Sequence, residues 1–156
     1  MSEPKPDVAG VIVFPPFLMA GAMISGALFE WLVPARVLPR AVAWGAGIVL
    51  MVLSALLARS AKAAMRRVGT EVRPDRPTTA LALDWPYTKT RNPIYIAGLG
   101  VILAVAFMVN SLWSFLFMIP FTLVLHFGVV LREERYLSAR FGEPYRQYMA
   151  RVRRWL

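Results

Sequence analysis

Two short clusters of polar residues carry most of the chemistry that this 156-residue sequence could perform. The first is Tyr87–Tyr95 (YTKTRNPIY), which Gly98-Leu99-Gly100 follows closely. The second is Arg132-Glu133-Glu134-Arg135. Two adjacent carboxylates could hold a cationic or polyhydroxyl ligand, and glycines leave room for a ligand or a neighbouring backbone. If the two clusters meet in the fold, they would form a binding site for such a ligand.

The same residues also have a purely structural interpretation. Arg91 and Arg132 could extend to the membrane surface, and the two glutamates could pair with nearby arginines. Gly98 and Gly100 could simply allow two helices to pack closely. Spacing alone leaves both interpretations open. It shows no Ser–His–Asp arrangement and no set of metal ligands, so the catalytic residues stay unknown.

The elements that must position these clusters are apolar helices. Three stretches contain no Asp, Glu, Lys or Arg: residues 8–29, 41–58 and 92–131. About 20 apolar residues cross a bilayer as a helix, so the 40-residue stretch is long enough for two crossings. We therefore expect an all-α integral membrane protein with four transmembrane helices, in a single domain over residues 1–156. The expected spans are 11–33, 40–58, 93–109 and 112–131.

Charge predicts how these helices lie in the membrane. A turn at Asn110-Ser111 would make the last two spans an antiparallel hairpin, bringing both clusters to one membrane face. Of the 18 Lys and Arg residues, 16 would lie on that face and two on the other, so it is expected to be cytoplasmic. Trp31, Trp44 and Trp113 would lie at the opposite, outer interface, where aromatic residues are enriched. We expect a prokaryotic inner membrane, with both termini in the cytoplasm.

The cytoplasmic segments differ in kind. Residues 69–86 contain Pro74, Pro77 and Pro86 and are expected to form an ordered connecting loop. Residues 132–156 are densely charged, with apolar side chains at helical spacing and a break near Pro144. Such an amphipathic helix could lie on the membrane surface or close over a pocket.

Composition excludes several other classes of function. Cysteine is absent, so disulfides, thiolate nucleophiles and cysteine-ligated metals are excluded. A net charge of +9 could suit nucleic acid, but the basic residues flank apolar spans, where anionic lipid headgroups are the simpler partner. We therefore expect no nucleic acid and no metal among its partners.

An ordered set of motifs resembles a known family. The set is Thr90–Tyr95 (TRNPIY), an apolar hairpin, Glu133-Glu134-x-x-Leu137, Phe141-Gly142, and Tyr145-x-x-Tyr148 with Val152. It resembles the membrane-embedded methyltransferases that include isoprenylcysteine carboxyl methyltransferases and phospholipid N-methyltransferases. The resemblance covers about Gly69 to Leu156. It implies S-adenosylmethionine as methyl donor and a lipophilic or prenylated acceptor.

The family's site residues can be carried over by position. Asn92-Pro93-Ile94-Tyr95 stands where the family has a His-Pro-x-Tyr cofactor motif, so an asparagine replaces the usual histidine. Val129 stands where the prenylcysteine enzymes have a substrate-contacting arginine, which weakens the case for a prenylcysteine carboxylate. The cofactor-binding residues implied are Thr79, Ala80, Leu81, Ala82, Tyr87, Asn92, Pro93, Ile94, Tyr95, Gly98, Gly100, Glu133 and Glu134.

Two further residues are candidates for substrate contact. Arg132 lies at the end of the last expected span, and His126, the only histidine, lies about two turns before Glu133. His126 could orient a substrate or act as an acid or base, or it could be a neutral packed side chain.

Two other functions stay open at this point. A membrane reductase of the sterol-reductase type has a similar C-terminal region and would bind a nicotinamide dinucleotide such as NADPH. A non-catalytic membrane adaptor would bind neither cofactor.

Overall fold

The computed structural model describes residues 8–70 and 77–156, and within these ranges every regular element is helical. The predicted domain also includes residues 1–7 and 71–76, which lie outside the described residues. The helices are α1 (Pro15–Leu32), α2 (Arg40–Arg67), α3 (Pro93–Val109), α4 (Leu112–Leu125), a π-helical turn η1 (His126–Val130), α5 (Leu131–Phe141) and α6 (Glu143–Arg151).

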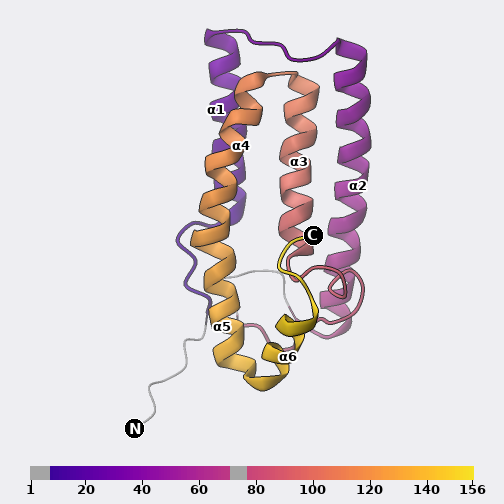
Figure 1. Ribbon diagram of the computed structural model, residues 1–156, viewed down its shortest axis with the longest axis vertical. Coiled ribbons are helices and arrows are strands. Elements are labelled where there is room, and N and C mark those ends of the chain that lie inside the picture. The colour runs from indigo at the N-terminus through magenta and orange to yellow at the C-terminus, as the bar shows by residue number, and fades with distance from the viewer. Residues whose placement is uncertain (1–7, 71–76) are drawn as a thin grey trace.

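Helices α1, α2 and α3 and the continuous run from α4 to α5 lie side by side (Figure 1). Helix α2 packs against α3, and α1 packs against α4. The buried face of α2 is made of small side chains, which allow close approach of its neighbour; they are Ala43, Gly47, Ser54, Ala61 and Ala64. Helix α2 and the continuous helical run Leu112–Phe141 are each long and apolar enough to cross a membrane, and α3 is a shorter apolar helix.

The outward face of α2 supports this interpretation. Val42, Val49, Val52, Leu53 and Leu56 are all exposed. A soluble protein rarely exposes such a contiguous apolar surface, whereas a bilayer accepts it. The described part of the chain is therefore an all-helical protein with membrane-spanning character.

At one end of the bundle, Asn110 links the turn between α3 and α4 to the connection between α1 and α2. This residue ends α3 with a positive φ of 57°, a conformation that asparagine tolerates better than most residues. Its Oδ1 accepts hydrogen bonds from the amides of Val37 (3.3 Å) and Leu38 (3.0 Å), and its Nδ2 donates to the carbonyl of Leu38 (2.6 Å). The predicted Asn110-Ser111 turn is present, and it also holds the α1–α2 connection.

Asn110→Ala is expected to lower the free energy of unfolding by about 2–3 kcal/mol, because it loses three hydrogen bonds and strains a positive φ. Asn110→Gly loses the same bonds without the strain. It should therefore lower the free energy of unfolding by roughly 1 kcal/mol less than Asn110→Ala does. Thermal unfolding in detergent measures both. Equal stability of Asn110→Ala and the wild type would contradict this role.

Two helices extend beyond the expected spans at the end of the bundle that α6 covers. Helix α2 continues past Ala58 to Arg67, because Ala61 and Ala64 are buried against Tyr87 and the aromatic residues of α6. Helix α3 has the expected bounds, with Pro93 at its first position. The last expected span, 112–131, contains the unexpected turn η1 and continues as helix to Phe141.

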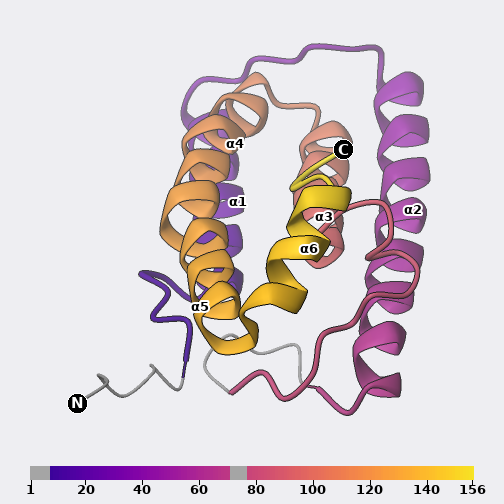
Figure 2. The same cartoon turned by 60° about the horizontal axis from the view of Figure 1, so that its bottom comes forward.

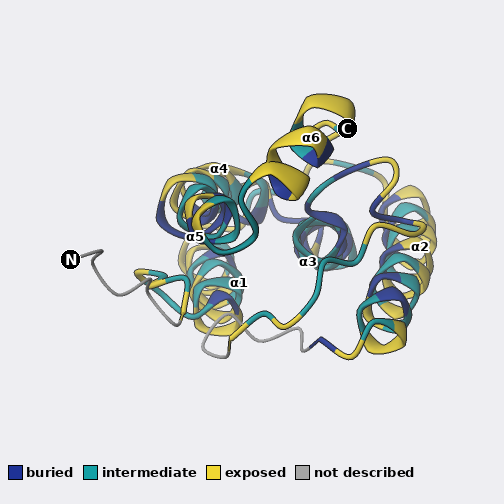
Figure 3. Ribbon diagram, turned by 90° about the horizontal axis from the view of Figure 1, so that it is seen from below, coloured by how far each residue is buried: buried dark blue, intermediate teal, exposed yellow. Residues whose placement is uncertain are grey.

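The C-terminal region folds back over the bundle. Gly142, with a φ of 63°, separates α5 from α6, which confirms the expected break near Pro144. Helix α6 and the tail then lie across the start of α3 (Figure 2), where the amide of Arg91 donates to the carbonyl of Arg153 (2.9 Å). The inward side of α6 is buried and its outward side exposed (Figure 3). Helix α6 thus covers one end of the bundle, as a helix that closes over a pocket would.

Candidate functional site

One cavity of about 570 Å³ lies inside the end of the bundle that α6 covers. The start of α1, the end of α2, the connection before α3, and helices α3, α4, α5 and α6 all contribute side chains to its wall. Its volume is in the usual range for a small-molecule site. The two clusters singled out in the sequence therefore meet at this cavity.

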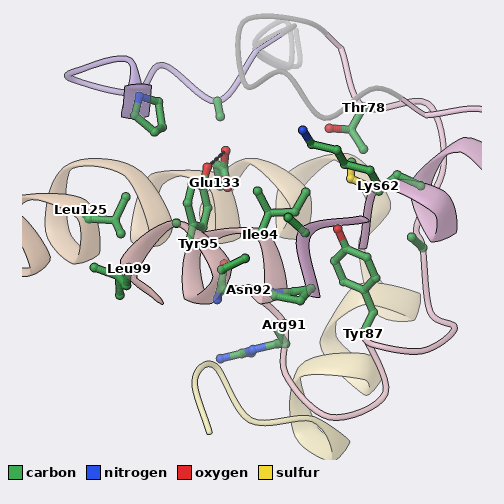
Figure 4. A pocket seen from close by; sticks show the side chains of 18 of the residues that line it. Lys62, Thr78, Tyr87, Arg91, Asn92, Ile94, Tyr95, Leu99, Leu125 and Glu133 are labelled. Atoms are coloured by element: carbon green, nitrogen blue, oxygen red, sulfur yellow. Dashed lines mark hydrogen bonds between the residues drawn. The ribbon is translucent and has the colours of Figure 1, made fainter. Parts of the chain in front are cut away.

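Glu133 supplies the acidic group of the cavity. The Tyr95 hydroxyl donates a hydrogen bond to Glu133 Oε1 at 2.6 Å, and both side chains line the cavity (Figure 4). Within residues 8–70 and 77–156, no lysine or arginine forms an ion pair with Glu133. Its carboxyl group therefore has no cationic partner in the protein, and a cationic ligand in the cavity could pair with it.

Glu134, the next residue, faces the other way and is buried. Its carboxylate pairs with Arg91 Nη2 at 3.1 Å and with Arg154 Nη2 at 2.9 Å, and Arg154 Nε donates to it as well. It does not line the cavity. The structural interpretation therefore applies to Glu134, and the ligand-binding one fits Glu133.

Three tyrosines, two of them on α6, form one wall of the cavity. Tyr87, Tyr145 and Tyr148 line the cavity, and the Tyr148 hydroxyl donates to the Tyr87 carbonyl at 2.8 Å. Burial raises the pKa of all three phenols above the ordinary value, so they stay neutral. Neutral aromatic faces can contact a cation or stack against a planar ring.

Asn92 is held by the C-terminal tail. Its Nδ2 donates to the carbonyl of Arg154 at 3.0 Å, and the Thr90 hydroxyl donates to the same oxygen at 3.0 Å. Asn92 is buried and lines the cavity. The C-terminal tail thus fixes the start of α3, where the Tyr87–Tyr95 cluster borders the cavity.

The opposite end of the cavity is apolar. Its lining residues come from α1, α3 and α4, and include Met19, Gly98, Leu99, Phe121 and Leu125. This end lies deeper in the bundle than Glu133 and Tyr95 do. A single cavity therefore joins a polar region, which contains Glu133, to an apolar region.

Most of the predicted cofactor-binding residues come together here. Those that line the cavity are Ala80, Leu81, Ala82, Tyr87, Asn92, Pro93, Ile94, Tyr95, Gly98 and Glu133.

Three predicted cofactor-binding residues do not line it. They are Glu134, described above, Thr79 and Gly100. The Thr79 hydroxyl donates instead to the Gly69 carbonyl at 2.9 Å, because the loop closes back on the end of α2. A Cβ on Gly100 would collide with the hydroxyl of Ser54, so this glycine serves the packing of α3 on α2.

The two candidate substrate residues also lie outside the cavity lining. His126 Nδ1 accepts a hydrogen bond from Trp155 Nε1 at 3.3 Å, which makes it a packed side chain. Arg132 Nη1 donates to the Gly10 carbonyl at 3.1 Å and so ties the N-terminal segment to α5. A role for either in substrate contact stays a prediction without geometric support.

Sequence reasoning missed several cavity residues. Tyr145 and Tyr148 recur at a spacing of three on an amphipathic helix, a signal that could have placed both on the inner face. Lys62 and Tyr136 enter the lining because α2 and α5 extend beyond the expected spans. Arg91 also lines the cavity.

Gly100→Ala is expected to destabilise the protein by about 1–3 kcal/mol, because α2 and α3 must move apart at Ser54. Gly21→Ala is the matched control, since a Cβ there meets nothing within 4 Å and alanine favours the helix. Ser54→Gly should restore stability to the Gly100→Ala variant. Thermal unfolding in detergent compares the variants, and equal melting temperatures for the two alanine substitutions would refute the close contact.

Comparison with known proteins shows which family the chain resembles. A 63-residue segment, 40% of this chain, is 38% identical to the whole of a Haemophilus influenzae protein described as an uncharacterized protein. No solved structure matches. A model of the phospholipid methyltransferase family matches residues 42–144, which run from α2 into α6 and include both clusters. The chain therefore belongs to the phospholipid methyltransferase family.

Proposed function

We propose that this protein transfers a methyl group from S-adenosylmethionine to a lipophilic acceptor at the cytoplasmic face of a membrane. The family supports methyl transfer in general. The observation that carries the proposal is the single cavity, which joins the Glu133 and tyrosine region to an apolar region between α1, α3 and α4. Such a cavity can hold a polar donor and an apolar acceptor side by side.

The polar region fits the chemistry of the methyl donor. S-Adenosylmethionine carries a sulfonium and an ammonium, and Glu133 offers a carboxylate with no cationic partner among the described residues. The rings of Tyr87 and Tyr95 offer aromatic faces to the same charges. The small side chains of Ala80 and Ala82 leave space at the wall. These residues would hold the cofactor.

The apolar region fits the acceptor. Met19, Phe121 and Leu125 line it, and the flexible thioether of a methionine adapts to chains of different shape. Gly98 contributes no side chain, and a Cβ there would meet only the end of Met19. We infer that the hydrocarbon part of a lipid or prenyl group occupies this region.

The chain's own part in the reaction is to align and to shield. The sulfonium of the bound donor supplies an already activated methyl group, so the protein needs to hold the acceptor in line with it. The Tyr95 hydroxyl fixes the carboxylate of Glu133 through the 2.6 Å hydrogen bond. Helix α6 covers the cavity with Tyr145 and Tyr148 and keeps water from the reacting groups.

The proposed membrane arrangement has four crossings. Helices α1 and α3 would join α2 and the Leu112–Phe141 run as transmembrane segments, with α6 on the cytoplasmic side. The basic residues cluster at the end of the bundle that carries the cavity, which favours that end as cytoplasmic. The donor would then enter from the cytosol and the acceptor from the bilayer of a prokaryotic inner membrane.

Calorimetry on the detergent-solubilised protein tests the proposal. We expect S-adenosylmethionine to bind and NADPH not to bind. Binding of NADPH alone would favour a membrane reductase, and binding of neither would favour an adaptor. Transfer of a radioactive methyl group from the donor to an extracted membrane lipid would then identify the acceptor class.

A further inference from the structure

The cavity has a lateral opening between α1 and α2. Helix α1 packs against α3 and α4, and α2 packs against α3, but no packed interface joins α1 to α2 among the described residues. Pro16 of α1 and Ala55 of α2 both line the cavity and are both exposed. Ala55 lies in the uncharged stretch 41–58, which the proposed arrangement places within the bilayer. The lateral opening therefore connects the cavity to the hydrocarbon of the membrane.

The C-terminal tail covers a different side of the bundle. Trp155 packs against a cluster of buried side chains from α3, α4 and η1. Figure 3 shows α6 and the C-terminus away from the side between α1 and α2. An acceptor that comes from the bilayer would therefore reach the cavity through the lateral opening, without displacing the tail.

The α2 wall of the lateral opening ends in a positive charge. The residues of α2 that line it recur at spacings of three and four, so they share one face of the helix; they are Ala55, Ala58, Lys62 and Met65. Ala55 and Ala58 are small and apolar, whereas Lys62 carries an ammonium one turn beyond Ala58. Lys62 forms no ion pair within residues 8–70 and 77–156. This ammonium is therefore free to bind an anion.

The position of Lys62 suits the headgroup of an amphiphile. Figure 4 shows Lys62 and Thr78 toward one end of the cavity, and Leu99 and Leu125 of the apolar region toward the other. Thr78 also lines the cavity, and its hydroxyl adds a hydrogen-bond donor at the same end. Glu133 is not paired with Lys62, so the cavity offers separate groups to a cation and to an anion.

We propose that the methyl acceptor is an amphiphile with an acidic headgroup, which pairs with Lys62 while its chain occupies the lateral opening. This inference rests on the proposed function and adds the chemical class of the acceptor to it. The acid is a phosphate or a carboxylate, since the compact charge of a lysine binds either. Lys62 then holds the headgroup at the membrane surface, and the apolar wall of α2 accepts the chain.

The first experiment compares three probes by calorimetry on the detergent-solubilised protein. Oleoyl lysophosphatidic acid and monooleoylglycerol share one chain and differ in the phosphate, and glycerol phosphate is the headgroup without the chain. We expect the wild type to bind the lysophosphatidic acid about tenfold or more tighter than it binds either other probe. Lys62→Gln should lose the preference over monooleoylglycerol. Arg66→Gln should keep it, because Arg66 is an exposed basic residue of α2 that does not line the cavity.

The second experiment locates the bound chain. The protein has no cysteine, so a single one can be introduced and labelled with N-ethylmaleimide. We expect lysophosphatidic acid to slow the labelling of Ala55→Cys severalfold, because the chain would cover this residue. Leu56→Cys is the matched control, since Leu56 is exposed but does not line the cavity, and its labelling should not change.

Each result bears on one part of the inference. Equal affinity of the wild type for lysophosphatidic acid and monooleoylglycerol would overturn the acidic headgroup, and this needs no variant to fold. A preference that Lys62→Gln keeps, or that Arg66→Gln loses as well, would overturn the role of Lys62. Glycerol phosphate that binds as tightly as the lipid would assign the site to a water-soluble anion instead. Equal labelling behaviour of the two cysteines would overturn the lateral opening as the chain's site.

The failure of this inference is distinguishable from the failure of the proposed function. Binding of S-adenosylmethionine to the same wild-type samples tests the proposed function alone. Donor binding without a preference for lysophosphatidic acid would overturn only the acceptor class. A preference for lysophosphatidic acid without donor binding would leave a lipid-binding site and overturn methyl transfer, and with it the assignment of this lipid as acceptor.

Discussion

Glu134→Gln is expected to destabilise the protein by about 3 kcal/mol or more. The substitution keeps the shape of the side chain but leaves Arg91 and Arg154 without a counter-charge, and Arg91 is 10% exposed. Removing one partner from a buried ion pair leaves the other charge buried and unpaired, which typically costs about 3–5 kcal/mol. Partial exposure of Arg154, at 35%, places the expected loss at the lower end of that range.

The matched control is Glu143→Gln in the same region. Glu143 pairs with Arg146 at 2.9 Å, but the two side chains are 62% and 58% exposed, so the pair is solvated. Its loss should change stability by less than about 1 kcal/mol. Chemical unfolding in detergent compares the two variants. A similar small effect for both would show that Glu134 does not hold the tail.

The same variant should also loosen the C-terminal tail. The carbonyl of Arg154 accepts hydrogen bonds from Asn92 and Thr90, so the ion pair and these bonds hold one segment together. We expect trypsin to cleave Glu134→Gln near Arg151 and Arg153 faster than it cleaves the wild type. This would link the ion pair to the cover that α6 places over the cavity.

The sequence predicts the helices well where the signals are local. Pro93 begins α3 and Asn110 ends it in a left-handed conformation, and both residues favour those positions by their own chemistry. The extension of α2 to Arg67 has no such signal. It depends on the burial of Ala61 and Ala64 beneath α6, which is far along the chain.

The π-helical turn η1 is a second feature that has no local signal in the sequence. It contains Gly128, Val129 and Val130, all buried, and the Gly128 carbonyl accepts a hydrogen bond from the amide of Ile12 at 3.1 Å. A contact between segments more than 100 residues apart cannot be inferred from a hydrophobic period. The turn also adds a residue to the helix and so rotates everything after it by about 100°.

That rotation explains why the sequence could bring the two clusters together but could not tell which of the two carboxylates faces the cavity. Successive residues on a helix point about 100° apart, so Glu133 and Glu134 must face different surroundings. Which one faces the cavity depends on η1, which lies directly before α5. The clusters could therefore be brought together by the hairpin, whereas the separate roles of the two glutamates required the structure.

Glu133→Gln is expected to weaken binding of S-adenosylmethionine by about tenfold to a hundredfold. This corresponds to the loss of one charge-assisted interaction, about 1.5–3 kcal/mol. A glutamine can still accept the hydrogen bond from the Tyr95 hydroxyl, so the shape of the cavity should not change. Stability should stay the same or rise slightly, because a partly buried carboxylate without a cationic partner is replaced by a neutral amide.

The substitutions of the two glutamates are thus expected to have opposite effects on affinity and stability, so each variant is the control for the other. Calorimetry and unfolding of the same two samples should show Glu133→Gln losing affinity with its stability intact, and Glu134→Gln losing stability first. Tyr95→Phe, which removes only the 2.6 Å hydrogen bond to Glu133, should weaken binding less than Glu133→Gln does. Unchanged donor affinity in Glu133→Gln would remove this carboxylate from the site, and with it the charge that makes the cavity suited to a sulfonium.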